Sequence, residues 1–232
     1  VLTGPKSDLL IAKLTDEKTD NESFPWLSHK SIKLCGEDTR VLKVSYAGEK
    51  GFEIHVHNNS MKKIYDELVQ HGENFNLIHF GMLALDSMRL EKNYRSWKSD
   101  LTSDYTMLQS GLEKWIKFDK GNFIGKEALK NEFDLGTSKK FVTLVVDDPE
   151  DNKPFGEPVY LSPVFAGDDY LGPIVSSGYG HRVKKSISMA ILDDRNLNGL
   201  NDQLYIDVLG RKRKAYIVNE ALYDPENLKL RS

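Results

Sequence analysis

The sequence has only one cysteine, Cys35, in 232 residues. A single cysteine excludes an internal disulfide framework and a multi-cysteine metal site, and it is typical of a reducing compartment. The chain also lacks an apolar run of about 18 residues and a signal peptide, so we expect a soluble protein without a membrane partner. It begins at Val1 without an initiator methionine, which suggests a fragment of a larger protein.

The sequence also lacks a strong excess of charge. Lysine and arginine number 32 and aspartate and glutamate 35, which gives a net charge of −3. This balance predicts no bulk attraction to nucleic acid or to an anionic membrane. Hydrophobic residues make up 39% and aromatic residues 10%, which is enough for a core and too much for a disordered chain. The length indicates one large domain or two modest ones.

Helical and strand patterns alternate in the first half of the chain. Residues 15–32 are polar and irregular, and no element is expected there. The predicted elements are, in order, a helix beginning at Pro5, a β-hairpin of residues 41–46 and 52–56, a helix capped by Ser60, a helix from about Phe80 to Lys92, a short strand at 115–118 and a small helix at 126–131. Glycines flank the hairpin loop, residues 47–51. The set predicts an α+β unit.

Beyond Lys139 the pattern changes to short β-type runs separated by Gly, Pro, Asn and Asp. The runs are residues 141–146, 158–161, 171–176, 187–192, 204–208 and 215–218. This spacing favours an antiparallel barrel or sandwich. We therefore expect two domains, an α+β domain at 1–138 and a small antiparallel β-barrel at 139–232.

Several polar motifs have simple structural interpretations. Glu53, His55 and His57 share one face of a predicted strand, which is more simply its solvent side than a metal site, and we expect no bound metal. The segment 121–126 has the wrong spacing for a phosphate loop. The basic run 211–214 is interpreted as an exposed hairpin tip and not as a nucleic-acid site.

Two charged positions are candidates for ligand binding. Glu49 lies in the glycine-flanked hairpin loop, where the backbone permits close approach of a ligand, although the pattern alone favours a solvated turn residue. Arg89 lies beside apolar helix positions and could simply pair with Asp86, one turn earlier. The pattern alone leaves both alternatives open.

Motifs across nearly the whole chain are similar to those of a known family. They are Tyr46–Ile54 (YAGEKGFEI), Leu85–Lys92 (LDSMRLEK), Asp119–Leu129 (DKGNFIGKEAL), and Gly172–Gly178 with Ser186–Ala190. The first resembles the Y-x-G-E-x-G-x-E segment of the aminomethyltransferase family, that is, the glycine-cleavage T-protein and its relatives. One branch of the family matches best, the dimethylglycine and sarcosine dehydrogenases. Their C-terminal half is similar to this chain at residues 80–81, 89–97, 100–101 and 222–227.

The resemblance implies a fold and an activity. The fold is a T-protein-like folate-binding α+β domain, here lacking its N-terminal portion, followed by a small antiparallel β-barrel. In the dehydrogenase branch an upstream flavin domain, which holds FAD, oxidises a small N-methyl amine to an iminium, and the folate module captures the one-carbon unit as 5,10-methylenetetrahydrofolate. The expected cofactor of this chain is therefore tetrahydrofolate. The expected compartment is the cytoplasm, or the mitochondrial matrix in a eukaryote.

The resemblance also implies roles for five residues. Glu49 is the carboxylate that accepts hydrogen bonds from the amino group and ring N–H of the pterin. Arg89 orients the folate, Tyr46 flanks the pterin ring, and Trp97 and Asp100 lie at the matching helix exit. The family's catalytic aspartate lies farther upstream of its Y-x-G-E segment than Val1 does here. No catalytic residue is therefore assigned, and the chain alone is expected to bind folate weakly and to be inactive.

Three other functions are weighed against this one. A glycine-cleavage-type aminomethyltransferase would use another one-carbon donor, and the chain does not identify its donor. A non-catalytic folate-binding module, of the type that assists iron–sulfur proteins, has a cysteine where this chain has Asn122. A nucleic-acid-binding barrel depends only on the basic run 211–214.

Overall fold

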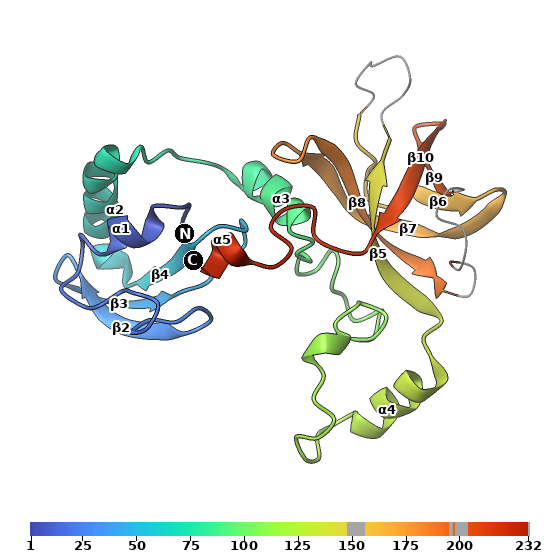
Figure 1. Ribbon diagram of the computed structural model, residues 1–232, viewed down its shortest axis with the longest axis horizontal. Helices are drawn as coiled ribbons and strands as arrows, with labels where there is room; N and C mark the ends of the chain where they lie inside the picture. The colour runs from blue at the N-terminus through green and yellow to red at the C-terminus, as the bar shows by residue number, and fades with distance from the viewer. Residues whose placement is uncertain (148–155, 195–196, 198–203, 232) are drawn as a thin grey trace. The chain divides into compact units, whose positions relative to one another are not determined.

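The computed structural model describes residues 1–147, 156–194, 197 and 204–231. The chain forms two compact units (Figure 1). Unit 1 consists of Val1–Lys92 together with Tyr223–Ser232, and unit 2 consists of Asn93–Leu222. The C-terminal segment therefore returns to the unit in which the chain begins.

Unit 1 is an α+β unit built on a four-stranded antiparallel sheet of order β1-β4-β3-β2. Its elements are β1 (Leu2–Thr3), α1 (Ser7–Ile11), β2 (His29–Leu34), β3 (Glu37–Leu42), β4 (Gly51–Val56), α2 (Asn58–Gly72), the 3-10 helix η1 (Glu73–Phe75), α3 (Met82–Glu91) and α5 (Leu228–Arg231). Helices α1 and α2 cover one face of the sheet (Figure 1), and the core between them contains Leu10, Ile11, Ile32, Leu34, Val41, Phe52 and Ile64.

Three expectations for unit 1 need correction. Part of the stretch 15–32 is not irregular, because strand β2 begins at His29 and its apolar residues lie on the core face between polar neighbours. Strand β3 ends at Leu42, so the connection to β4 is longer than a tight hairpin loop. Helix α2 is capped by His57, which accepts from the Asn59 N–H at 3.3 Å. The Ser60 hydroxyl does not cap it and instead lies 2.5 Å from a carboxylate oxygen of Glu37.

Unit 2 contains a closed antiparallel barrel of order β10-β5-β8-β7-β6-β9 (Figure 1). Its elements are η2 (Glu113–Trp115), α4 (Lys126–Leu135), β5 (Lys139–Val146), β6 (Pro163–Ala166), β7 (Asp169–Gly180), β8 (Lys185–Asp193), β9 (Leu204–Val208) and β10 (Arg211–Val218). The barrel interior is filled by aliphatic side chains that include Leu144, Val164, Ile174, Leu192 and Ile206. The expected α+β part followed by an antiparallel barrel is confirmed. Of the two alternatives for the β-rich part, a barrel or a sandwich, the structure has the barrel.

Two predicted strands of unit 2 are wrong. The segment 115–118 begins in the 3-10 helix η2 and continues into a turn. The run 158–161 ends in a turn in which the N–H of Ser162 bonds the Val159 carbonyl, and Leu161 has a φ of 69°, which interrupts an extended chain. The strand of this region is β6, immediately after the turn.

The sequence suggested that the basic run 211–214 is a hairpin tip, and this expectation is wrong. The run forms the first half of β10 and pairs with β9. The tip is Leu209–Gly210, where both residues have a positive φ, the conformation that tight two-residue hairpin turns require. Within the run, Arg213 is buried and donates to the carbonyls of Asp147 and Gly156. At least this cation therefore serves the barrel structure.

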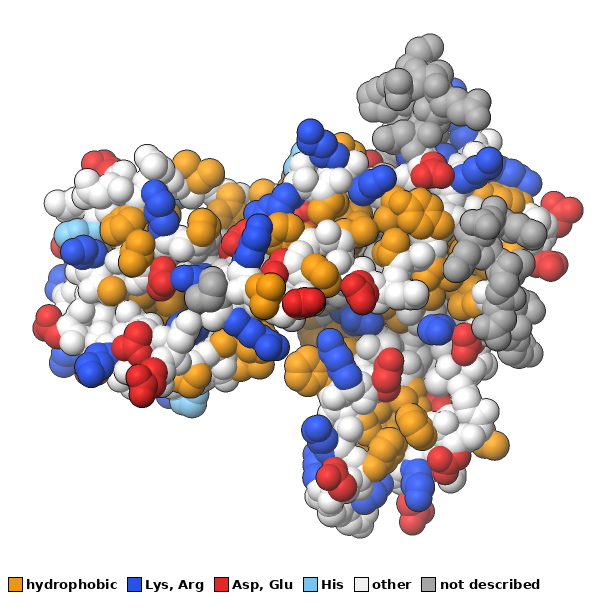
Figure 2. Space-filling model, viewed as in Figure 1, with side chains coloured by type: hydrophobic (Ala, Val, Ile, Leu, Met, Phe, Trp, Pro, Cys, Tyr) orange, Lys and Arg blue, Asp and Glu red, His pale blue; other side chains and the backbone are white. Residues whose placement is uncertain are grey.

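Acidic, basic and apolar side chains are interspersed over the face of the molecule drawn in Figure 2, in keeping with the nearly balanced charge. In the part of the chain that the structure describes, every helix is too short or too polar to cross a bilayer. The change of sequence pattern at Lys139 coincides with the start of β5. The two compact units, however, divide at residue 92. The domain boundary near residue 138 therefore stays a prediction.

Candidate functional site

Glu49 lies in the connection between β3 and β4, residues 43–50, which we call the Glu49 loop. The loop is anchored to the beginning of the chain. Both the Thr3 hydroxyl, at 3.0 Å, and the Gly4 N–H, at 2.9 Å, donate to the carbonyl of Lys50. The residue next to Glu49 is thereby held in place.

Gly48 allows the Glu49 loop to approach the end of helix α3. Its φ of 78° lies in the left-handed region, which favours glycine. A Cβ atom at this position would lie 2.4 Å from Cγ of Lys92, the residue that ends α3. The sequence pattern predicted that a ligand could approach this loop closely. In this structure the group close to Gly48 is the Lys92 side chain.

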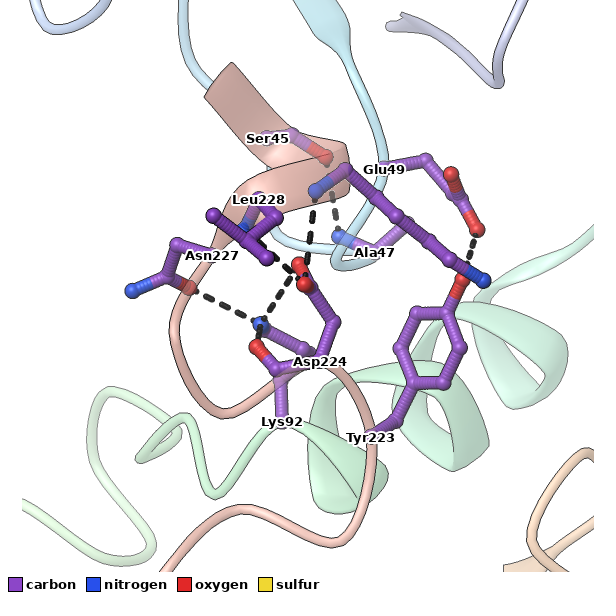
Figure 3. A network of polar contacts seen from close by, with 9 residues as sticks. Ser45, Ala47, Glu49, Lys92, Tyr223, Asp224, Asn227 and Leu228 are labelled. Atoms are coloured by element: carbon purple, nitrogen blue, oxygen red, sulfur yellow. Dashed lines mark hydrogen bonds and ion pairs between the residues drawn. The ribbon is translucent and has the colours of Figure 1, made fainter. Parts of the chain in front are cut away.

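The carboxylate of Glu49 is held by an aromatic hydroxyl. The hydroxyl of Tyr223 donates to Glu49 Oε1 at 2.5 Å (Figure 3). The Glu49 side chain is half-buried, so the group is partly screened from solvent without being enclosed. Tyr223 comes from the returning C-terminal segment, and its own N–H donates to the Glu91 carbonyl at the end of α3 at 3.0 Å.

Lys92 is the charged centre of the same network. Its side chain is 1% exposed, and Nζ donates to the Asp224 carbonyl at 2.5 Å and to Asn227 Oδ1 at 2.8 Å (Figure 3). The carboxylate of Asp224 lies 3.4 Å away. Burial lowers the pKa of Lys92, whereas the negative charges of Asp224 and Glu49 act in the opposite direction. Glu49 is therefore electrostatically coupled to the end of α3.

The other predicted folate residues of unit 1 lie on these same two elements. Tyr46 is a half-buried residue of the Glu49 loop. Arg89 lies in the last turn of α3 and is 2% exposed, and its Nε donates to Asp86 Oδ1 at 2.7 Å. The pairing that the sequence offered as the simple alternative for Arg89 is thus present. The contact of Gly48 with Lys92 brings the loop and the helix end together.

Trp97, the fourth predicted residue, belongs to unit 2. Its side chain is 77% exposed, and its backbone forms an isolated bridge with Leu101. Between them, Asp100 is fully buried and its carboxylate accepts from the Ser96 N–H at 2.7 Å and from the Ser176 hydroxyl. These bonds fix the turn that presents Trp97.

Sequence reasoning did not assign a role to Lys92, Tyr223, Asp224 or Asn227. The segment 222–227 was noted as similar to the dehydrogenases, and that likeness is a signal that could have led to them. Spacing rules could not, because Tyr223 and Glu49 are 174 residues apart in the chain.

The positions of Glu53, His55 and the single cysteine can be described. Glu53 and His55 are neighbours on β4, with His55 Nε2 3.4 Å from Glu53 Oε2. In the described ranges, no cluster of three or more His, Cys, Asp or Glu side chains is arranged to hold a metal ion. Burial raises the pKa of the Cys35 thiol, and this disfavours the reactive thiolate.

Comparison with known proteins matches two family models. The model of the GCVT N-terminal domain matches residues 1–120, and that of the glycine cleavage T-protein C-terminal barrel domain matches residues 139–224. The chain belongs to the glycine cleavage T-protein family. For a T-protein family member, the α+β unit and the closed barrel are the two expected parts.

Relatives of this T-protein family member carry two kinds of name. An aminomethyltransferase of Thermoanaerobacter sp. (strain X514) is 30% identical over 223 residues, which are 96% of this chain and 58% of the relative. The mitochondrial dimethylglycine dehydrogenase of Homo sapiens is 29% identical over 226 residues, which are 95% of this chain and 25% of the relative. The mitochondrial sarcosine dehydrogenase of Mus musculus is 26% identical in an alignment 237 positions long, which covers 99% of this chain and 25% of the relative. The chain thus spans somewhat more than half of the aminomethyltransferase and a quarter of the dehydrogenases.

A solved structure has the same fold. The crystal structure of the glycine cleavage system aminomethyltransferase T from Bartonella henselae aligns with a TM-score of 0.79 and 19% sequence identity. The alignment covers 96% of this chain and 58% of that one. At this identity the likeness establishes the fold alone.

Proposed function

We propose that this chain binds tetrahydrofolate through Glu49, and that the whole protein transfers a one-carbon unit to it from an N-methyl amine of the dimethylglycine or sarcosine type. The observation that carries the proposal is the Glu49 carboxylate, half-buried in a glycine-containing loop and held there by Tyr223. Membership of the T-protein family gives this position its meaning, because Glu49 falls on the glutamate of the Y-x-G-E segment.

The chemistry of the carboxylate fits a reduced pterin. The pterin edge presents an exocyclic amino group and a ring N–H side by side, and one carboxylate can accept from both. An ionised carboxylate has about four acceptor sites, so the bond from Tyr223 uses only part of the capacity of Glu49. Hydrogen bonds to a charged group contribute about 1.5–3 kcal/mol each.

The supporting residues have separate proposed roles. Arg89 places a buried positive charge on α3, whose end adjoins the Glu49 loop, and there it orients the folate. Tyr46, on the same loop as Glu49, offers a flat apolar wall for the pterin ring. Trp97 is assigned to the folate by resemblance, and its large exposed fraction leaves its ring available to a ligand.

The oxidative half of the proposed activity is assigned outside residues 1–232. We place the amine oxidation, and the FAD that it requires, in an upstream domain, because the matched region is a quarter of the dehydrogenase relatives. No catalytic residue is assigned to this chain, and by itself it is expected to bind folate weakly and to be inactive. The proposed compartment is the cytoplasm, or the mitochondrial matrix in a eukaryote.

A glycine-cleavage-type aminomethyltransferase is the second candidate, favoured by the 30% identity to the Thermoanaerobacter protein. The two candidates differ in the one-carbon donor. The complete protein is incubated with tetrahydrofolate and either dimethylglycine or an aminomethyl-lipoyl protein. Reduction of an electron-accepting dye by dimethylglycine supports the first candidate, and transfer from the lipoyl protein alone supports the second. Folate binding without transfer from either donor favours the non-catalytic module.

Calorimetry of tetrahydrofolate with the complete protein tests the binding site. We expect Glu49→Ala to weaken binding at least about tenfold, since it removes a charge-assisted hydrogen-bonding pair. Glu67→Ala is the matched control, because Glu67 is a partly exposed glutamate on helix α2 of the same unit, outside this motif. Equal affinities of the Glu49→Ala variant and the unmodified protein would remove Glu49 from the site.

A further inference from the structure

Residues 96–101 of unit 2, which we call the Trp97 turn, are closed by hydrogen bonds of their own backbone. The N–H groups of Asp100 and Leu101 both donate to the carbonyl of Ser96, at 3.0 and 3.2 Å. The backbone of Trp97 also forms a bridge with Leu101. The indole ring, 77% exposed, is therefore attached to a backbone that has little freedom to move.

The side chain of Asp100 joins the Trp97 turn to the barrel. It is fully buried, and its carboxylate accepts from the Ser96 N–H at 2.7 Å and from the hydroxyl of Ser176 on β7. One oxygen thus has its partner inside the turn, and the other has its partner on a strand 76 residues further along the chain. Because a buried carboxylate is costly without such donors, these two bonds fix the turn to β7.

An irregularity of strand β7 directs Ser176 toward the Trp97 turn. The register with β8 shifts here, since Ile174 pairs with Ala190 and Ser176 pairs with Met189. In a regular strand the side chains of residues 174 and 176 would lie on the same face. Ile174 belongs to the barrel core, whereas the Ser176 hydroxyl reaches Asp100, which is not part of the barrel. The bulge therefore re-aims this serine.

Arg95, immediately before the Trp97 turn, fastens the other end of it. Its guanidinium donates to the Ser110 carbonyl at 2.7 Å and lies 4.2 Å from the centre of the Phe141 ring on β5. Burial lowers the pKa of Arg95, whereas the negative charges of Glu113 and Asp100 act in the opposite direction. The segment that carries Trp97 is thus held to two strands of the barrel, β5 and β7.

We propose that Asp100 is a positioning residue for folate binding: its carboxylate fixes the Trp97 turn so that the indole ring is in place to stack against an aromatic ring of tetrahydrofolate. This inference rests on the proposed function, and within it on the assignment of Trp97 alone. Asp100 is assigned no contact with the ligand, because it is fully buried. A ring that is fixed beforehand loses less freedom when the ligand binds. The alternative is a purely structural bond between the turn and the barrel.

A double-mutant cycle in the complete protein separates these alternatives. Calorimetry of tetrahydrofolate is carried out on Trp97→Ala, Ser176→Ala and the double variant, and urea unfolding of each is recorded. Ser188→Ala is the matched control, since Ser188 is a buried serine of the neighbouring strand β8 whose hydroxyl has no hydrogen-bond partner within the described residues. Should Ser176→Ala fail to fold, Asp100→Asn replaces it, because its carboxamide has one acceptor oxygen and keeps one of the two bonds.

We expect Trp97→Ala to weaken binding about tenfold and Ser176→Ala about threefold to tenfold. Ser176→Ala should have no further effect once residue 97 is alanine, and Ser176→Thr, which keeps the hydroxyl, should restore the affinity. Ser188→Ala should bind tetrahydrofolate as the unmodified protein does.

A Ser176→Ala variant that loses stability but keeps its affinity overturns this inference, because the bond would then be structural only. An equal loss of affinity in both backgrounds also overturns it, since Asp100 would not act through Trp97. Unchanged affinity of Trp97→Ala overturns it as well and leaves the proposed function standing, which is tested through Glu49. If the unmodified complete protein binds no tetrahydrofolate, the proposed function is refuted and this inference with it.

Discussion

Lys92 is a buried cation that donates hydrogen bonds to Asp224 and Asn227 of the C-terminal segment. Its removal would leave the Asp224 carboxylate, only 6% exposed, without its counter-charge. Breaking a buried ion pair from one side costs about 3 kcal/mol or more, because the remaining charge stays buried. We therefore predict that Lys92→Met lowers the free energy of unfolding by about 3 kcal/mol, measured by urea denaturation followed by circular dichroism.

An exposed lysine of the same unit provides the control. Lys62 pairs with Asp66 one turn along α2, and both side chains are largely in solvent. Exposed pairs of this kind contribute about 0.5 kcal/mol or less, so Lys62→Met should have little effect. If both variants lose the same small amount, the Lys92 network contributes nothing special to stability.

For single residues, the sequence predicted the loop positions of Glu49 and Tyr46 but did not predict that Tyr223 contacts Glu49. Glu49 and Tyr46 belong to a short local motif, so pattern and resemblance could place them on one loop. Tyr223 meets Glu49 only through the tertiary fold, and no periodicity relates residues so distant in the chain. The ion pair of Arg89 with Asp86 was foreseeable because it is local to one helix.

Among the elements, the Glu49 loop depends on one glycine. Gly48→Ala forces a side chain into the left-handed region and also against Lys92, which is held by its own hydrogen bonds and cannot move aside. The conformational cost is about 1 kcal/mol, and overpacking adds about 1–3 kcal/mol. We predict a loss of about 2–4 kcal/mol in the free energy of unfolding, together with weaker tetrahydrofolate binding.

Gly36 separates these two costs. It lies in the same unit with a φ of 82°, and a Cβ atom there meets only Lys63 Nζ, at 4.0 Å. Gly36→Ala should therefore show the conformational cost alone, about 1 kcal/mol, with folate binding unchanged. An equal loss in the two variants would mean that the approach of the loop to Lys92 is not tightly packed.

The elements that were predicted correctly have strong local patterns. Strands β5 and β8 have long buried runs and β9 alternates in burial, and all three were identified with small errors at their ends, whereas β7 extends further than predicted. Strand β2 was missed because its exposed positions are histidine, serine and lysine and its apolar residues, Ile32 and Leu34, lie only in its second half. The run 158–161 has β-type residues, but a turn overrides that preference.

For the whole molecule, the division into two units makes unit 1 discontinuous in the chain, because it needs Tyr223–Ser232 to complete it. Unit 2 is continuous and has its own closed barrel and core. We therefore predict that residues 93–222 fold by themselves, with cooperative thermal unfolding in circular dichroism. Gradual unfolding without a transition would contradict the independence of this unit.

Unit 1 yields the complementary prediction. The backbone of Tyr223 bonds that of Glu91, so a short glycine–serine linker can join residue 92 to residue 223 without disturbing either. Residues 1–92 alone lack Asp224 and Asn227, the partners of Lys92, whereas the linked chain restores both. We expect the linked chain to unfold at a higher urea concentration than residues 1–92 alone. Lys92→Met removes the charge that Asp224 and Asn227 bind, so the linked chain with this substitution should lose most of this gain in stability. If the gain in stability is undiminished, the C-terminal segment stabilises unit 1 by apolar packing and not through Lys92.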